Sequence, residues 1–195
     1  MRMSRRVLVV GLVWVTNFYL LSFAVAQQSD QVVAERVLSP RWKELSRRAG
    51  MIFAGTVLTT ATQTVTAQTA ATDRSVPSVV SAVQLSFRVD HPIAGVEQGQ
   101  VLTIREWAGA WSMHRPMCRG QHILIFLYPP SRLGLTSPVG GPLGQVALDA
   151  SGKNVAEHEP KSVAPIGSSC SRLPAAGGSV SVVQLERAIR SAREE

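Results

Sequence analysis

The chain is poor in cysteine and in aromatic residues, and it lacks the common catalytic signatures. It has two cysteines in 195 residues, and Phe, Trp and Tyr make up 6% of it. A Gly-x-Ser-x-Gly elbow, a His-Glu-x-x-His zinc motif and a Walker lysine are all missing. No run of aromatics interleaved with Lys or Arg occurs, which argues against nucleic acid as a ligand. These absences favour a non-catalytic binding domain over an enzyme.

The first 26 residues have the three parts of a signal peptide. Three arginines lie among the first six residues, an almost unbroken apolar run covers 7–23, and Ala24-Val25-Ala26 places small residues before a cleavage site. The alternative is an uncleaved membrane anchor, because the apolar run is close to the shortest length that spans a bilayer. Asn17 weakens such a span. We expect cleavage before Gln27 and export to the periplasm or the medium, with membrane contact only through an uncleaved leader.

The charge balance becomes modest once the leader is set aside. The whole chain has 20 Lys and Arg against 13 Asp and Glu; without the three leader arginines the balance is 17 against 13, a net charge of +4. Such a surface suits acidic envelope polymers or lipid headgroups, yet it is also ordinary for a soluble domain. The 169 residues after the leader are enough for one domain with its own core.

The two cysteines are expected to pair with each other. Export to an oxidising compartment makes a disulfide between Cys118 and Cys170 the default, and closing a loop of about 50 residues contributes roughly 4 kcal/mol in the chain-entropy estimate. A metal site is the alternative, because His114, Cys118 and His122 are spaced four residues apart. Pro116 interrupts the helix that such a site needs, and a fourth ligand is missing. We therefore expect no metal and no cofactor.

Apolar patterning predicts five strands. Val83 to Val89 alternates strictly with polar residues, so one face of that strand belongs to a core. Gly55 inside the first apolar run indicates a strand bent at a bulge, and Ile123–Tyr128, apolar on both faces, indicates a central strand. The stretches 59–78 and 91–99 are expected to be a long connection and a turn. The predicted strands cover 51–58, 83–90, 101–107, 123–128 and 145–148.

Two helices are predicted, one on each side of the strands in the sequence. The first covers 40–49, with Ser39 as N-cap, Gly50 as C-cap, and Trp42, Leu45 and Ala49 on one face. The second covers 182–193 and begins with a capping box between Ser181 and Gln184. The expected organisation is a leader (1–26), an N-terminal segment with a short helix (27–50), a β-barrel (51–150), an irregular segment (151–178) and a C-terminal helix (179–195).

Five strands, the first of them bent, together with a final helix suggest a small OB-type barrel. The pattern Phe53-Ala54-Gly55-Thr56-Val57, then Phe87-Arg88-Val89, Gly95, Gly99, Leu102, Trp107, Gly109, Gly120 and Ile125-Phe126-Leu127 resembles the netrin-like, or tissue-inhibitor-of-metalloproteinase-like, barrels of exported bacterial proteins. The longer strings 102–109 and 133–141 resemble a family of unknown function within that group. The resemblance covers roughly 50–150 and implies a mainly β, five-stranded OB-like barrel. The inhibitors chelate the protease zinc with an N-terminal cysteine, whereas this chain has no cysteine before Cys118.

The histidines offer only weak grounds for catalysis. His91, His114, His122 and His158 could serve as bases, and Asp90, Asp149 and several serines could complete a triad. Asp90 and His91 are neighbours in an extended segment and should point apart. His158 lies between two glutamates and is expected to be solvated.

A binding surface is predicted after the third strand. The segment 105–115 holds two of the three tryptophans that follow the leader, and Trp and Arg are the residues that most often anchor interfaces. We expect Trp111, His114 and Arg115 to form this surface, with Trp107 and Arg105 beside them, and we expect Trp107 to close the barrel. The predicted function is an exported binding domain for another exported protein or an envelope polymer. A secreted hydrolase or a protease-inhibitor-like accessory protein is the alternative.

Overall fold

The computed structural model of the chain describes residues 29–67, 78–111, 117–156 and 180–195; at 63–67 and 78–80 it describes the backbone alone. The predicted leader, the His114 and Arg115 part of the predicted binding surface, His158 and Cys170 lie outside these ranges. Cleavage, export and the disulfide therefore stay predictions.

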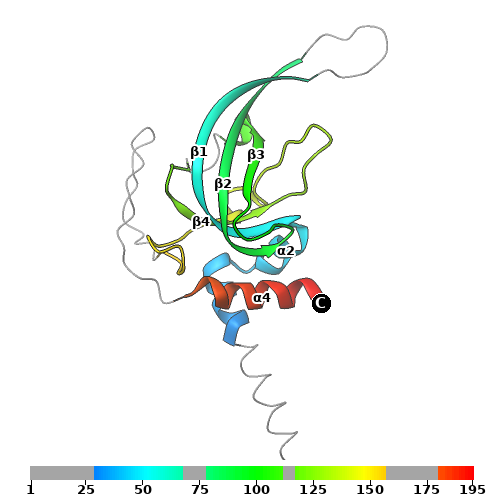
Figure 1. The fold of residues 1–195 in the computed structure, drawn as a ribbon. Helices are drawn as coiled ribbons and strands as arrows, with labels where there is room; N and C mark the ends of the chain where they lie inside the picture. The colour runs from blue at the N-terminus through cyan, green and yellow to red at the C-terminus, as the bar shows by residue number, and fades with distance from the viewer. Residues whose placement is uncertain (1–28, 68–77, 112–116, 157–179) are drawn as a thin grey trace, which may run out of the picture.

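The protein is mainly β, built around one open antiparallel sheet of five strands in the order β3-β2-β1-β4-β5. The strands are β1 (Met51–Ala67), β2 (Ser78–Ala94), β3 (Val101–Trp107), β4 (His122–Leu127) and β5 (Gln145–Ala147). Figure 1 shows β1 and β2 as two long, strongly curved ribbons that rise together out of the sheet. All five predicted strands are present, and the bounds of β3 agree with the prediction.

The first two strands are longer than predicted. The stretch 59–67 belongs to β1, where it pairs in register with β2 from Thr59 opposite Ser86 to Ala67 opposite Ser78. Its many threonines are β-branched residues that favour extended structure, so the expected connection was wrong over these residues. The expected turn at 91–99 was also wrong in its first part, because β2 continues to Ala94.

Bulges bend β1 and allow this extension. The register shifts between Ala54 and Gly55, which confirms the predicted bulge, and again on either side of it. A Cβ atom on Gly55 would lie 2.5 Å from the carbonyl oxygen of Arg88, so only glycine fits there. The bend turns the start of β1 so that it can pair with both β2 and β4.

Two apolar cores lie on opposite faces of the sheet. The inner core, enclosed by the curved strands, contains Phe53, Leu85 and Phe87, and the rings of Phe53 and Phe87 meet edge to face at 5.7 Å. The helix-side core contains Leu124 and Phe126 of β4, whereas Ile123, Ile125 and Leu127 of the same strand face the inner core. The prediction that β4 is central and apolar on both faces is confirmed.

Helices cover the lower part of the outer face. Residues 29–38 form a helix that the sequence did not predict, followed by α2 (Trp42–Arg48), and α4 (Val182–Glu194) runs across the lower end of the sheet in Figure 1. The capping box between Ser181 and Gln184 is present. Arg193 donates to the carbonyl oxygens of Ser46 and Ala49, which fixes α4 to the end of α2.

The predicted caps of α2 were wrong. Ser39 is left-handed, with φ 86°, because it lies at the junction of two helices, and Arg41 occupies the N-cap position. Gly50 is not left-handed; it is required because a Cβ there would lie 2.8 Å from a side-chain carbon of Pro129. The buried face with Trp42 is as predicted. Within the described ranges, no helix is long and apolar enough to cross a membrane.

Candidate functional site

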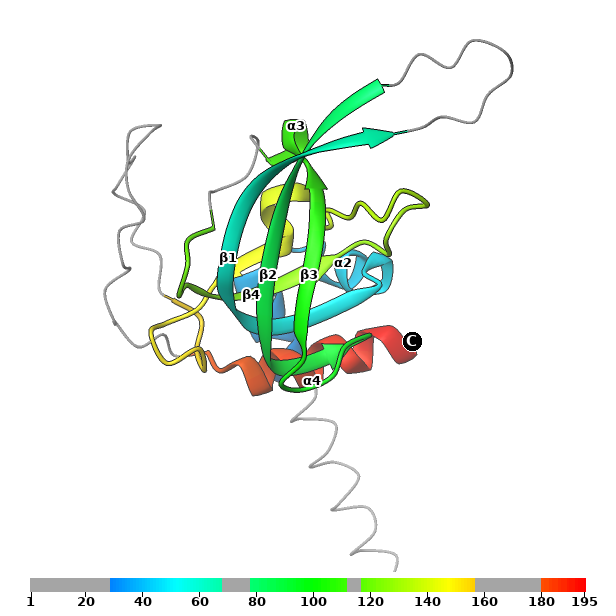
Figure 2. The same cartoon turned by 45° about the horizontal axis from the view of Figure 1, so that its top comes forward.

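The upper outer face of β2 and β3 is not covered by helices. In Figure 2 the strands β1, β2 and β3 lie side by side with no helix drawn in front of them, and α4 lies below. Alternation along β2 sends Val83, Leu85 and Phe87 into the inner core and the residues between them outward. We call the outward row on these two strands the outer strip. It consists of Gln84, Ser86, Arg88, Val101, Thr103, Arg105 and Trp107.

Cross-strand pairs hold the outer strip together. Gln84 lies opposite Arg105, and Ser86 lies opposite Thr103, whose hydroxyl is 3.0 Å from the Ser86 hydroxyl. Thr59 of β1 continues this row on the other side of Ser86. The middle of the face is thus a lattice of polar side chains that extends over three strands.

Trp107 lies at the upper end of the outer strip and is exposed to solvent. Its exposed fraction is 55%, although we expected this tryptophan to close the barrel. A Cβ atom on Gly109 would lie 2.5 Å from the indole ring, so the ring rests directly on the backbone of α3 (Ala108–Trp111). The far edge of the six-membered ring therefore lies against the Gly109 backbone, and about half of the side chain is open to solvent.

Trp111 takes the opposite position from the one predicted. It is the last residue of α3, is half-buried, and packs against the inner core. The short helix turns the chain back over the end of the sheet, and this return carries the side chain inward. The expectation that Trp111 is an exposed loop residue was wrong.

Arg105 is positioned by the segment that follows β4. Its carbonyl oxygen accepts a hydrogen bond of 2.8 Å from the backbone N–H of Thr136, and it forms a parallel bridge with Leu135. A Cβ atom on Gly134 would lie 2.8 Å from Nη2 of Arg105, so the left-handed glycine leaves room for the guanidinium. Among the described residues, Arg105 has no acidic partner.

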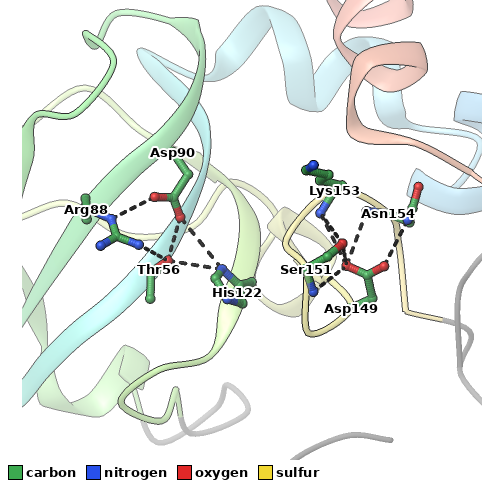
Figure 3. A network of polar contacts seen from close by, with 8 residues as sticks. All are labelled: Thr56, Arg88, Asp90, His122, Asp149, Ser151, Lys153 and Asn154. Carbon is green, nitrogen blue, oxygen red and sulfur yellow. Dashed lines mark hydrogen bonds and ion pairs between the residues drawn. The ribbon is translucent and has the colours of Figure 1, made fainter. Parts of the chain in front are cut away.

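A polar cluster borders the outer strip where the helix-covered region begins. Figure 3 shows Thr56, Arg88, Asp90 and His122, from three different strands, converging on one another. The Thr56 hydroxyl donates to Asp90 Oδ2 at 2.5 Å and lies 3.0 Å from His122 Nδ1. Arg88 Nε donates to Asp90 Oδ1 at 2.8 Å. Burial raises the pKa of Asp90, but the hydrogen bonds from Thr56 and Arg88 and the nearby positive charges outweigh burial and lower it.

This network determines which nitrogen of His122 carries a proton. An ionised Asp90 can only accept, so the single hydroxyl proton of Thr56 points to Asp90. The Thr56 oxygen must then accept from Nδ1 of His122, as it also does from Arg88 at 3.4 Å. We infer that neutral His122 is the Nδ1–H tautomer, with its lone pair on Nε2.

The turn at 149–154 lies beside this cluster. Asp149 accepts hydrogen bonds from the Ser151 hydroxyl at 2.7 Å and from the Asn154 amide at 2.9 Å (Figure 3). These bonds lower the pKa of Asp149 far below its ordinary value. Gly152 lies against the His122 ring, because a Cβ there would be 2.9 Å from Nδ1. Asp149 therefore organises its own turn.

His91 is separate from the polar cluster, as predicted from the extended backbone. Its Nε2 lies 2.5 Å from a carboxylate oxygen of Glu186, and Arg190 donates to the other oxygen at 2.7 Å. Burial raises the pKa of Glu186, but its bonds to His91 and Arg190 outweigh burial and lower it. This set of contacts fastens α4 to β2.

Glu106 is the residue that sequence analysis missed most clearly. It shares the inner side of β3 with Ile104, two residues earlier, and is 0% exposed. Burial raises its pKa to about 7. Alternation along β3 could have indicated this burial, since it places Glu106 on the same side as Ile104. A glutamate at the end of a strand is usually solvated, however.

Other places offer less chemistry. The described residues contain no group of three His, Cys, Asp or Glu that could hold a metal, and His114 of the alternative metal set lies outside them. An open hollow beside β1 is lined by one cationic side chain, that of Arg119, and by no carboxylate or histidine. Its lining residues are Leu58, Thr59, Thr60, Met117, Cys118 and Arg119.

No protein-family model matches the chain, and no curated protein or solved structure matches it either. The resemblance to netrin-like and inhibitor-like barrels thus stays a prediction.

Proposed function

We propose that the protein is an exported, non-catalytic binding domain whose ligand lies along the outer strip. The observation that carries this proposal is the exposure of Trp107, a large aromatic side chain that lies open to solvent although a packed core is close by. An exposed, supported indole beside an arginine is the composition of an interface anchor. Of the residues of the predicted surface, Trp107 and Arg105 lie on the outer strip, whereas Trp111 packs against the inner core.

We further propose that the open sheet is a partly closed OB-type barrel. Support comes from the strand order, in which β1 pairs with both β2 and β4, and from the parallel bridge between Arg105 and Leu135, which joins the β3 edge to the segment before β5. OB-type barrels bind extended polymers on the face of their second and third strands. The outer strip occupies the corresponding face.

Hydrolysis is less well supported by the polar cluster. A nucleophilic hydroxyl must transfer its proton to a base, but the Thr56 proton is already donated to Asp90, a weak base because its pKa is lowered. Thr56 is also only 8% exposed. Ser151 likewise donates to Asp149. These contacts fit a structural network better than a catalytic one.

The proposal is tested with the purified domain immobilised and exposed separately to the protein and glycan fractions of its own cell envelope. Trp107→Ala should lose capture without losing stability, since the side chain is exposed. Val183→Ala is the matched control, because Val183 is 53% exposed on α4. Equal capture by Trp107→Ala and wild type would show that the outer strip is not the binding site.

A further inference from the structure

We propose that the ligand of the outer strip is an acidic polysaccharide, a linear glycan that carries anionic groups. This inference rests on the proposed binding function and specifies its ligand class. Three observations carry it, and each matches one property of such a polymer: an apolar ring face, many hydroxyl groups and negative charge.

The first observation is the geometry of Trp107. The far edge of the indole lies against the backbone at Gly109 while 55% of the residue stays exposed, which leaves a planar apolar surface held at one end. A pyranose ring presents an apolar face of C–H groups that can lie flat on such a platform. The supported indole loses little conformational freedom on binding, so stacking costs little entropy.

The second observation is the chemistry of the middle of the strip. Gln84, Ser86 and Thr103 provide an amide and two hydroxyls, which together donate and accept hydrogen bonds. Sugar hydroxyls also do both, so the match does not depend on one orientation. A protein partner would instead be expected to fill apolar contacts along the strip, whereas the exposed large apolar side chains of the strip are Trp107 at one end and Val101 at the other.

The third observation is charge. The charge of Arg88 is offset by Asp90 at 2.8 Å, whereas Arg105 has no acidic partner among the described residues. The strip therefore carries about one uncompensated positive charge beside the platform. One charge suits a glycan with occasional carboxylate or sulfate groups; a nucleic acid, with a phosphate at every unit, normally needs several cations.

The length and openness of the face favour a chain over a small molecule. From Val101 to Trp107 the strand spans about 20 Å at roughly 3.3 Å per residue, which is room for several sugar units. The strip is a strand face, and the hollow described above does not include its residues. Small ligands are usually enclosed in concave pockets.

The test is isothermal titration of the protein with a polygalacturonate oligomer that is largely methyl-esterified, so that only occasional sugar units carry a free carboxylate, and with a neutral dextran oligomer of matched length. We expect measurable binding of polygalacturonate, a loss of about tenfold or more in Trp107→Ala, and partial rescue in Trp107→Phe. Arg105→Gln should weaken polygalacturonate binding and reduce its salt dependence, with dextran binding unchanged. Val183→Ala should match wild type.

Several outcomes would overturn the inference. Equal affinity for dextran and polygalacturonate would show that charge plays no part. Tight binding of a DNA oligonucleotide or of anionic lipid vesicles, with no preference for polygalacturonate, would show that the ligand is an anion of another class. If wild type binds neither glycan but captures an envelope protein through Trp107, the glycan inference fails and the binding function stands; if Trp107→Ala captures as well as wild type, both fail.

Discussion

Replacing Glu106 by glutamine should make the protein less sensitive to pH. The Glu106 side chain is fully buried beside the inner core, and burial raises its pKa from 4.5 to about 7. Glutamine has nearly the same shape as a protonated glutamate and cannot ionise. Glu106→Gln therefore removes the titration while leaving the packing almost unchanged.

The sign of the effect follows from which state holds the proton. Between pH 4.5 and about 7 the folded protein keeps the Glu106 proton and the unfolded chain has lost it. The free energy of unfolding thus decreases as pH rises through this window and is constant on either side of it. A difference of roughly 2.5 pKa units at 1.36 kcal/mol each corresponds to about 3 kcal/mol.

The measurement is chemical denaturation of wild type and Glu106→Gln at pH 4 and pH 8. At each pH we take the free energy of unfolding of the variant minus that of wild type. We expect this difference to be about 3 kcal/mol larger at pH 8 than at pH 4, which corresponds to several degrees in melting temperature. Glu97→Gln is the control, since it is the same substitution at an exposed position in the turn after β2. Taking the difference between proteins cancels the other titrating groups.

Two results would refute this reasoning. If the two proteins show parallel pH profiles, Glu106 is ionised in the folded state at neutral pH. If Glu106→Gln is less stable than wild type at pH 8, the charged carboxylate stabilises the fold and burial does not dominate.

Four further predictions concern other parts of the chain. The intact mass of the secreted product should equal that of a chain that begins at Gln27; a product that retains the leader would contradict cleavage. The unfolded, unreduced protein should show no free thiol, and Cys170→Ser should lower the melting temperature, because the bond closes a long loop. Trp111→Ala should destabilise the protein by about 2 kcal/mol in denaturant unfolding, since the side chain packs on the inner core; an unchanged midpoint would place it on the surface. Nitrogen NMR should find neutral His122 as the Nδ1–H tautomer, and Thr56→Val should shift it toward the other tautomer; a wild-type Nε2–H form would overturn the proton assignment.

Local sequence determined the elements whose signals lie within a few residues. The alternation in β2 and the bounds of β3 follow from side-chain periodicity alone, because successive residues of a strand face opposite sides. The capping box of α4 is equally local, since Ser181 and Gln184 satisfy each other's backbone groups. The bulge at Gly55 could be predicted because a glycine inside a strand often marks a bulge.

Tertiary structure decided what depends on partners distant in the chain. Residues 59–67 form a strand because β2 lies opposite them; their threonines favour extended structure, but the sequence does not show which strand they pair with. Thr56, Asp90 and His122 meet only through the pairing of β1 with both β2 and β4. The two tryptophans exchanged their expected roles because α3 reverses the chain direction at the end of β3, so Trp107 stays on the outer face and Trp111 returns to the core. Periodicity shows which residues share a face, but only the completed packing determines which part of that face remains in contact with water.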